Sequence, residues 1–237
     1  MENLFAVANP VVSQTESLIS NQNKMKHLLV FVVAITASFM LRAQSDKYVN
    51  AMKSNIAQLD SAHDPNKLAD LANSFERIAD AEKSQWLPYY YAAYCQVMNS
   101  YMEPDKSKDD ALADKADQLI KKAEQLNGGE NSETCVIKSM IASAHLMVDP
   151  QNRWMQYGQS SSVEMAKAKT MDPTNPRPLL LEGQTKFYTP EQYGGSKSEA
   201  KQLFTKALQL FDQFKPSSDL HPTWGKAATN YFLQQCN

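Results

Sequence analysis

The sequence predicts an all-α protein, because its composition and the spacing of its apolar residues both favour helices. Good helix formers (Ala, Leu, Lys, Gln, Met and Glu) dominate, and glycine occurs only 7 times. Apolar residues recur at three- and four-residue steps, as in Leu68, Leu71, Phe75 and Ile78. No alternating two-residue pattern of useful length indicates a strand. Because hydrophobic residues make up 43% of the chain, we expect a folded core.

The overall charge argues against two classes of partner. The chain carries 24 basic and 26 acidic residues, a formal net charge of -2. This balance predicts neither a nucleic-acid-binding surface nor a polybasic membrane-binding surface. The three cysteines, Cys95, Cys135 and Cys236, form no CxxC pair. We therefore interpret them as small buried hydrophobic residues, rather than as zinc ligands or a disulfide framework.

An export signal begins inside the chain. Lys26 and His27 precede an uncharged apolar run, Leu28–Leu41, and Ala43 follows at the boundary with polar sequence. This order is typical of a secretory signal peptide, and the run is too short to span a membrane. The pattern resembles bacterial export signals, particularly those of exported Bacteroidetes-type proteins. A core helix or an uncleaved anchor is the alternative.

We infer three segments from this signal. Residues 1–24 are expected to be an upstream extension with no structural role, which makes Met25 the true start. Residues 25–43 are expected to be the signal peptide, with cleavage after Ala43. Residues 44–237 are expected to form a single helical-repeat domain. This organisation predicts a periplasmic or secreted protein with no stable membrane span after cleavage.

The mature region predicts a series of helices joined by short connections. The first contains Tyr48 to Leu59, and the second follows the helix-start signal Asp64-Pro65 and contains Leu68 to Ile78. The last is expected to cap the stack, with Trp224, Tyr231 and Phe232 covering the core. The others cover about Trp86–Met102, Asp109–Leu126, Ser132–Val148, Trp154–Met171, Pro176–Phe187 and Ser196–Phe214, and the last about Pro222–Gln235.

A small-large-small order of side chains recurs along these helices. It is clearest at Ala200, Phe204 and Ala207. Small side chains let the two helices of a hairpin approach closely, and the large one fills the space beside them. Two other sets have the same spacing: Ala116, Ile120 and Ala123, and Ser161, Met165 and Ala168.

These motifs resemble the tetratricopeptide repeat (TPR) family. The stretch AKTMDPTNPRPLLLEG, which ends at Gly183, is similar to the junction between two such repeats, and EAKQLFTKALQL is similar to the second helix. The resemblance covers residues 86–235 well and 45–83 loosely. It implies an α-α superhelix, a TPR-like stack of antiparallel helix hairpins. Two features depart from the family: the units run 39 to 45 residues instead of about 34, and Lys186 replaces an aromatic residue.

In helical-repeat proteins the first helix of each unit lines a concave groove, and Tyr and Arg are favoured binding anchors. We therefore predict a non-catalytic scaffold that binds a protein or peptide. The alternative for the aromatic residues is packing between repeats. The predicted binding residues are Tyr90, Tyr94, Met98, Lys138 and Arg177.

Two other functions remain open. One is a small-molecule or glycan-binding module with an aromatic pocket, and the less favoured one is an unrecognised hydrolase. We expect no enzyme activity, cofactor or metal. No HExxH motif is present, and Gly194-Gly195-Ser196 lacks the Gly-Lys-Ser/Thr order of a phosphate loop. Ser196 is expected instead to cap the helix that follows, with Glu199 completing a capping box.

Overall fold

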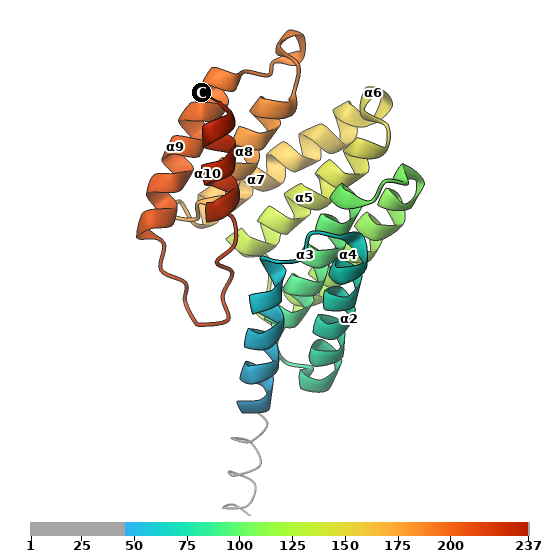
Figure 1. Cartoon of the computed structure of the whole chain (residues 1–237). Helices are drawn as coiled ribbons and strands as arrows, with labels where there is room; N and C mark the ends of the chain where they lie inside the picture. Colours follow the sequence, from blue (N-terminus) through green and yellow to red (C-terminus); the bar gives the residue numbers. More distant parts are fainter. Residues whose placement is uncertain (1–45, 237) are drawn as a thin grey trace, which may run out of the picture. The chain divides into compact units, whose positions relative to one another are not determined.

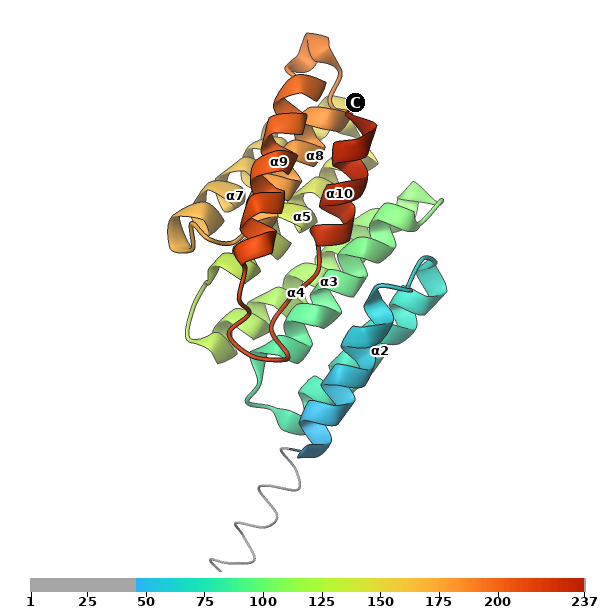
Figure 2. The ribbon, with the colours of Figure 1, turned by 60° about the vertical axis from the view of Figure 1, so that its left-hand side comes forward.

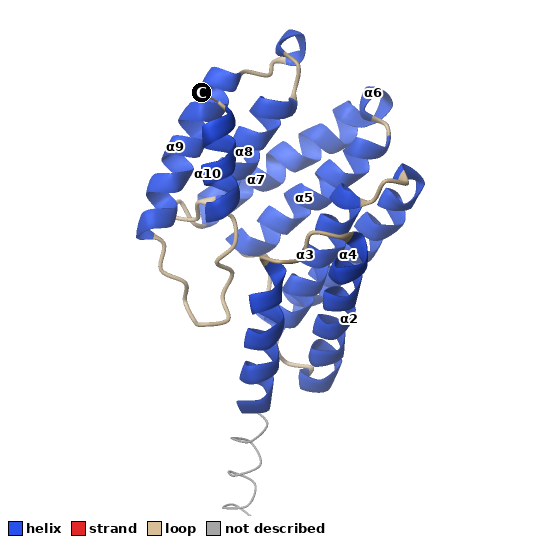
Figure 3. Ribbon diagram, viewed as in Figure 1, coloured by secondary structure: helices blue, strands red, loops and turns tan. Residues whose placement is uncertain are grey.

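The computed structural model describes residues 46–236, so the predicted extension, signal peptide and cleavage point lie outside the described residues. Contacts between Cα atoms divide the chain into two units, Met1–Tyr48 and Val49–Asn237. Residues 46–48, which belong to the first unit, are helical. The described residues contain helices and no strand (Figure 3), which confirms the all-α prediction.

The helices follow the predicted order (Figure 1). In the second unit the chain is helical up to residue 59. The labelled helices then follow as α2 (Pro65–Glu82), α3 (Trp86–Met102), α4 (Asp109–Asn127), α5 (Ser132–Val148), α6 (Pro150–Arg153), α7 (Gln159–Met171), α8 (Arg177–Tyr188), α9 (Lys197–Gln213) and α10 (Lys226–Gln235).

Local sequence signals explain where several helices begin. The Asp64 side chain caps α2 by accepting a hydrogen bond from the Lys67 backbone, and Pro65 occupies the first turn. Asn131 and Thr134 form a reciprocal capping box at α5. Ser196 accepts a hydrogen bond from the Glu199 backbone, so its predicted capping role is confirmed. The Glu199 carboxylate pairs with Lys186 instead of completing the predicted capping box.

Consecutive helices pack side by side along the chain. Helix α3 contacts α2 and α4, and α5 contacts α4 and α7. The last part continues with α8 against α9 and α9 against α10, as both ribbon views show (Figures 1 and 2). Helix α5 also contacts α3 and α8. The inner helices α3 and α5 therefore each pack against several neighbours, whereas α2 packs mainly on α3 and α10 on α9.

The small-large-small positions lie in the core. Ala200, Phe204 and Ala207 are all fully buried. At Gly183 an added Cβ atom would lie 2.5 Å from the Phe204 ring. Helices α8 and α9 therefore approach too closely for any larger residue at Gly183, which is the packing that the sequence pattern predicts. The corresponding positions of α4 and α7 are buried as well: Ala116, Ile120, Ala123, Ser161, Met165 and Ala168.

Two helix boundaries differ from the prediction. The helix expected from Trp154 instead starts with the short α6, because Asp149 caps it and Pro150 fits its first turn. A π-helical turn, η2 (Trp154–Gly158), separates α6 from α7. The last helix starts at Lys226 rather than at Pro222. Before it, Gly225 adopts a positive φ of 112°, which interrupts helical geometry.

Within residues 46–236 we find no helix whose length and apolar character would suffice to cross a membrane.

Ala207 offers a direct test of the close helix contact. Substitution to Leu should overpack the buried contact of α9 and lower the free energy of unfolding by about 1–3 kcal/mol. Lys206→Leu, at the exposed neighbouring position, should leave stability nearly unchanged. The measurement is thermal and urea unfolding of both variants. An unaltered unfolding curve for Ala207→Leu would contradict the proposed helix packing.

Candidate functional site

A buried ion pair joins α5 to α8. Arg177, in the first turn of α8, is fully buried, and its Nη1 atom donates to Glu133 Oε1 at 2.8 Å. The Asn175 side-chain amide donates to the same oxygen at 2.9 Å. Burial raises the pKa of Glu133, although the positive charge of Arg177 opposes this effect. The hydrogen bond from Asn175 supplements the ion pair, and a buried ion pair needs such additional hydrogen bonds.

Aromatic residues complete this network. The Tyr90 hydroxyl donates to Glu133 Oε2 at 3.0 Å and accepts from Trp224 Nε1 at 2.9 Å. The ring of Tyr94 lies 4.8 Å from that of Trp224. The guanidinium of Arg177 lies 5.0 Å from the Trp224 ring centroid, a cation–π distance. Tyr90, Tyr94 and Arg177 therefore meet around Trp224.

The connection between α9 and α10 lies against the residues of this network. We call residues 214–225 the connecting segment; Figure 2 shows it as the long red loop. The Tyr91 hydroxyl donates to the Leu220 carbonyl oxygen at 2.9 Å, and Arg177 Nη2 donates to that of Pro222 at 2.5 Å. These side chains bind backbone carbonyl groups of a non-helical segment that turns at residues 219–220. Here the bound segment belongs to the same chain.

The five predicted binding residues have different surroundings. Tyr90 and Arg177 are 0% exposed, so neither offers surface to a partner in this structure. Tyr94 and Met98 are half-buried on α3. Lys138 is not part of the network, because it lies among Glu124, Glu130 and Glu164. The binding role of these five residues stays a prediction.

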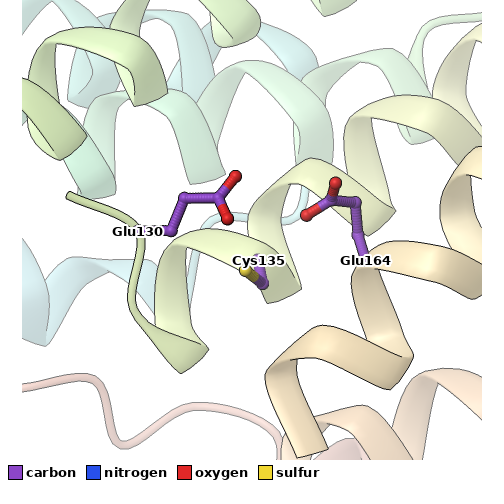
Figure 4. Close-up of side chains that lie close together, drawn as sticks. All are labelled: Glu130, Cys135 and Glu164. Carbon is purple, nitrogen blue, oxygen red and sulfur yellow. The ribbon is translucent and has the colours of Figure 1, made fainter. Parts of the chain in front are cut away.

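Three potential metal ligands lie around Lys138. Figure 4 shows Glu130 and Glu164 with their carboxylates turned toward each other beside Cys135, and the ligand atoms of the three lie within 4.8 Å of one another. The Lys138 ammonium already forms ion pairs with both carboxylates. Burial raises the pKa of Cys135 to about 12, and a thiol must lose its proton to bind a metal. The cluster is therefore better suited to holding a lysine than a metal ion.

A second group of aromatic residues lies at the C-terminal end of the stack. Helix α8 ends with Phe187 and Tyr188, and α10 contributes Tyr231 and Phe232. We call these four residues the C-terminal aromatic cluster. The Phe232 ring lies 5.6 Å from Phe187, 5.7 Å from Tyr188 and 5.3 Å from Tyr231, measured between ring centroids. Phe232 also stacks on the buried ring of Phe204 in α9, with 5.4 Å between the ring centroids.

The cluster combines a buried base with an exposed surface. Phe232 is 8% exposed, whereas Tyr188 and Tyr231 are 69% and 56% exposed. Partial burial and the nearby Tyr231 phenol raise the pKa of Tyr188, so its hydroxyl remains protonated at neutral pH. The surface thus offers adjoining aromatic rings and phenol groups, which suit a flat apolar ligand with polar groups at its edge.

Sequence reasoning placed Tyr231 and Phe232 together as a cover for the core. Phe232 does lie in this core, and Trp224 packs against it as predicted while its Nε1 atom donates to the Tyr90 hydroxyl. Tyr231, in contrast, faces solvent. Tyr188 was not recognised at all. The sequence does contain a signal for its exposure, because the adjacent aromatic residues Phe187 and Tyr188 point in different directions from the helix and cannot both face the core.

A shallow hollow of about 490 Å³ lies elsewhere, between the end of α2 and α4. Tyr89 contributes its aromatic ring, and the Lys122 Nζ atom lies 5.4 Å from the centroid of that ring. Its other walls are mainly polar, so it is less suited to a large apolar ligand than the C-terminal aromatic cluster. The lining residues are Asp80, Lys83, Tyr89, Lys122, Gln125 and Leu126.

Replacing Arg177 tests the buried network. Arg177→Met should leave the Glu133 carboxylate buried without its counter-charge and lower the free energy of unfolding by about 3–5 kcal/mol. Urea unfolding measures the loss, and the exposed Arg77→Met variant is the matched control. The double variant Arg177→Met/Glu133→Gln should recover part of the free energy of unfolding that Arg177→Met loses. A loss below about 1 kcal/mol would contradict the buried pair.

Comparison with known proteins identifies one informative relative. No protein-family model and no curated protein matches the sequence, so the tetratricopeptide resemblance stays a prediction. Among solved structures, the HusA haemophore from Porphyromonas gingivalis is similar, with a TM-score of 0.71 and 38% sequence identity. The match covers 80% of this chain and 92% of that one. At this identity and coverage, the chain belongs to the same protein family as the HusA haemophore.

Proposed function

We propose that this chain is an exported, non-catalytic protein that binds haem or a related porphyrin at the C-terminal aromatic cluster. The observation that carries the proposal is that Tyr188 and Tyr231 both contact the Phe232 ring edge to face and are themselves largely exposed. The relative described as a haemophore indicates the ligand class. This proposal develops the small-molecule alternative rather than the protein-partner interpretation.

The chemistry of the cluster fits such a ligand. A porphyrin is a flat aromatic macrocycle, and each favourable aromatic contact contributes about 0.5–1.5 kcal/mol beyond the area that it buries. The exposed phenols of Tyr188 and Tyr231 supply hydrogen-bonding groups for the polar substituents at the edge of the macrocycle. Because both rings are exposed, a ligand can reach them without a rearrangement of the core.

The finer features of the sequence prediction belong to the same proposal. A signal peptide at residues 25–43 would deliver the mature protein to the periplasm or the exterior, where a carrier of an apolar nutrient has a use. A TPR-like superhelix would provide a rigid scaffold for the cluster, since preorganised surfaces lose less entropy on binding.

A protein or peptide partner remains a second candidate, in a narrower form. Tyr91 and Arg177 already bind the carbonyl groups of Leu220 and Pro222. A foreign peptide would have to displace the connecting segment and its hydrogen bonds to reach them. Within residues 46–236 no segment covers Tyr188 or Tyr231 of the C-terminal aromatic cluster, and for this reason we favour the porphyrin.

Removing both exposed rings should weaken porphyrin binding. Tyr188→Ala/Tyr231→Ala should raise the dissociation constant for ferric protoporphyrin IX about 5- to 150-fold, because loss of two ring contacts costs roughly 1–3 kcal/mol. Titration followed at the Soret absorbance band measures the change. Circular dichroism should show unaltered helix content, since both side chains are largely exposed.

Two tyrosine variants serve as controls. Tyr193→Ala removes a ring that is 74% exposed but belongs to the connection between α8 and α9 rather than to the cluster, and it should bind normally. Tyr89→Ala tests the hollow. If only Tyr89→Ala weakens binding, the ligand lies in the hollow and our site is wrong. If the unaltered protein shows no Soret change, the proposed function is wrong.

A further inference from the structure

A positive charge lies at the edge of the C-terminal aromatic cluster. Lys197 is the first residue of α9, and its Nζ atom lies 5.5 Å from the centroid of the Phe187 ring. Phe187 in turn contacts Tyr188 at 5.2 Å and Phe232 at 5.6 Å. The ammonium therefore lies beside Phe187, which itself contacts Tyr188 and Phe232, and the cation–π contact helps to hold it at this edge of the cluster.

This lysine differs from its neighbours in its charge partners. Lys186 is paired with Glu199 at 2.7 Å, so the nearby carboxylate is already engaged. Lys226 is paired with Asp212 at 2.7 Å. In contrast, Lys197 is exposed, and within residues 46–236 no carboxylate forms an ion pair with it. Its ammonium can accept an anionic partner without breaking an existing ion pair.

We propose that Lys197 binds a carboxylate of the ligand, so that the site selects porphyrins with free propionate groups. This inference rests on the proposed function and adds a ligand class to it. A porphyrin stacked on the cluster would carry its propionates at the edge of its ring, where a lysine can form a charge-assisted hydrogen bond. A flexible lysine suits this task, because it acts as a point charge and does not require one fixed carboxylate orientation.

The test compares protoporphyrin IX with its dimethyl ester, which keeps the ring but lacks the charges. Both iron-free ligands are titrated by fluorescence against the unaltered protein, Lys197→Ala and Lys197→Arg. Lys197→Ala should weaken binding of the free acid about three- to fivefold, the size expected for an exposed ion pair, and leave binding of the ester unchanged. Lys197→Arg should retain most of the affinity for the acid. Added salt should reduce the difference between acid and ester.

The matched control is Lys206→Ala, an exposed lysine on the same helix, which should behave like the unaltered protein. Equal weakening of acid and ester by Lys197→Ala, or an equal effect of Lys206→Ala, would overturn the role of Lys197 and leave the proposed function intact. Failure of both ligands to bind the unaltered protein would overturn the function and this inference together.

Discussion

The arrangement of the C-terminal half depends on the buried guanidinium of Arg177. A buried charge is costly unless it is paired and hydrogen-bonded, and Arg177 meets this requirement through Glu133 of α5 and the Pro222 carbonyl of the connecting segment. Pro222 is thereby fixed three residues before Gly225, where the backbone turns into α10. Helix α10 then places Phe232 against Phe204. One buried interaction thus positions the helix that carries half of the exposed aromatic surface.

Much of the helical architecture could be predicted, because it follows from contacts that repeat along the chain. The spacing of Ala200, Phe204 and Ala207 is enough to identify the buried face of α9, and the Asp64-Pro65 signal marks the start of α2. The start of α10 could not be predicted in this way. The residues before it are held by Tyr91 and Arg177, which are distant in sequence and whose hydrogen bonds are not visible in any local pattern.

The candidate site was harder to predict for a related reason. The neighbouring aromatic residues on α3 predict a binding role for Tyr90, yet its hydroxyl is hydrogen-bonded to Glu133 and Trp224 within the core. Tyr188 and Tyr231 come from different helices, and each lies next to a phenylalanine of similar size. Only the orientation of α8 and α10 decides that the phenylalanine turns inward and the tyrosine outward. That orientation is a property of tertiary packing. It leaves the Tyr188 side chain exposed and the Phe232 side chain buried.

We propose the C-terminal aromatic cluster as the porphyrin site, and nuclear magnetic resonance can test this placement directly. Gallium protoporphyrin IX is a diamagnetic substitute for haem whose ring current shifts the signals of nearby protons. Our account predicts the largest shifts at Phe187, Tyr188, Tyr231 and Phe232, with small changes at Tyr90 and at the Tyr89 hollow. Largest shifts around Tyr89 and Lys122, or around Tyr90 and Trp224, would contradict it.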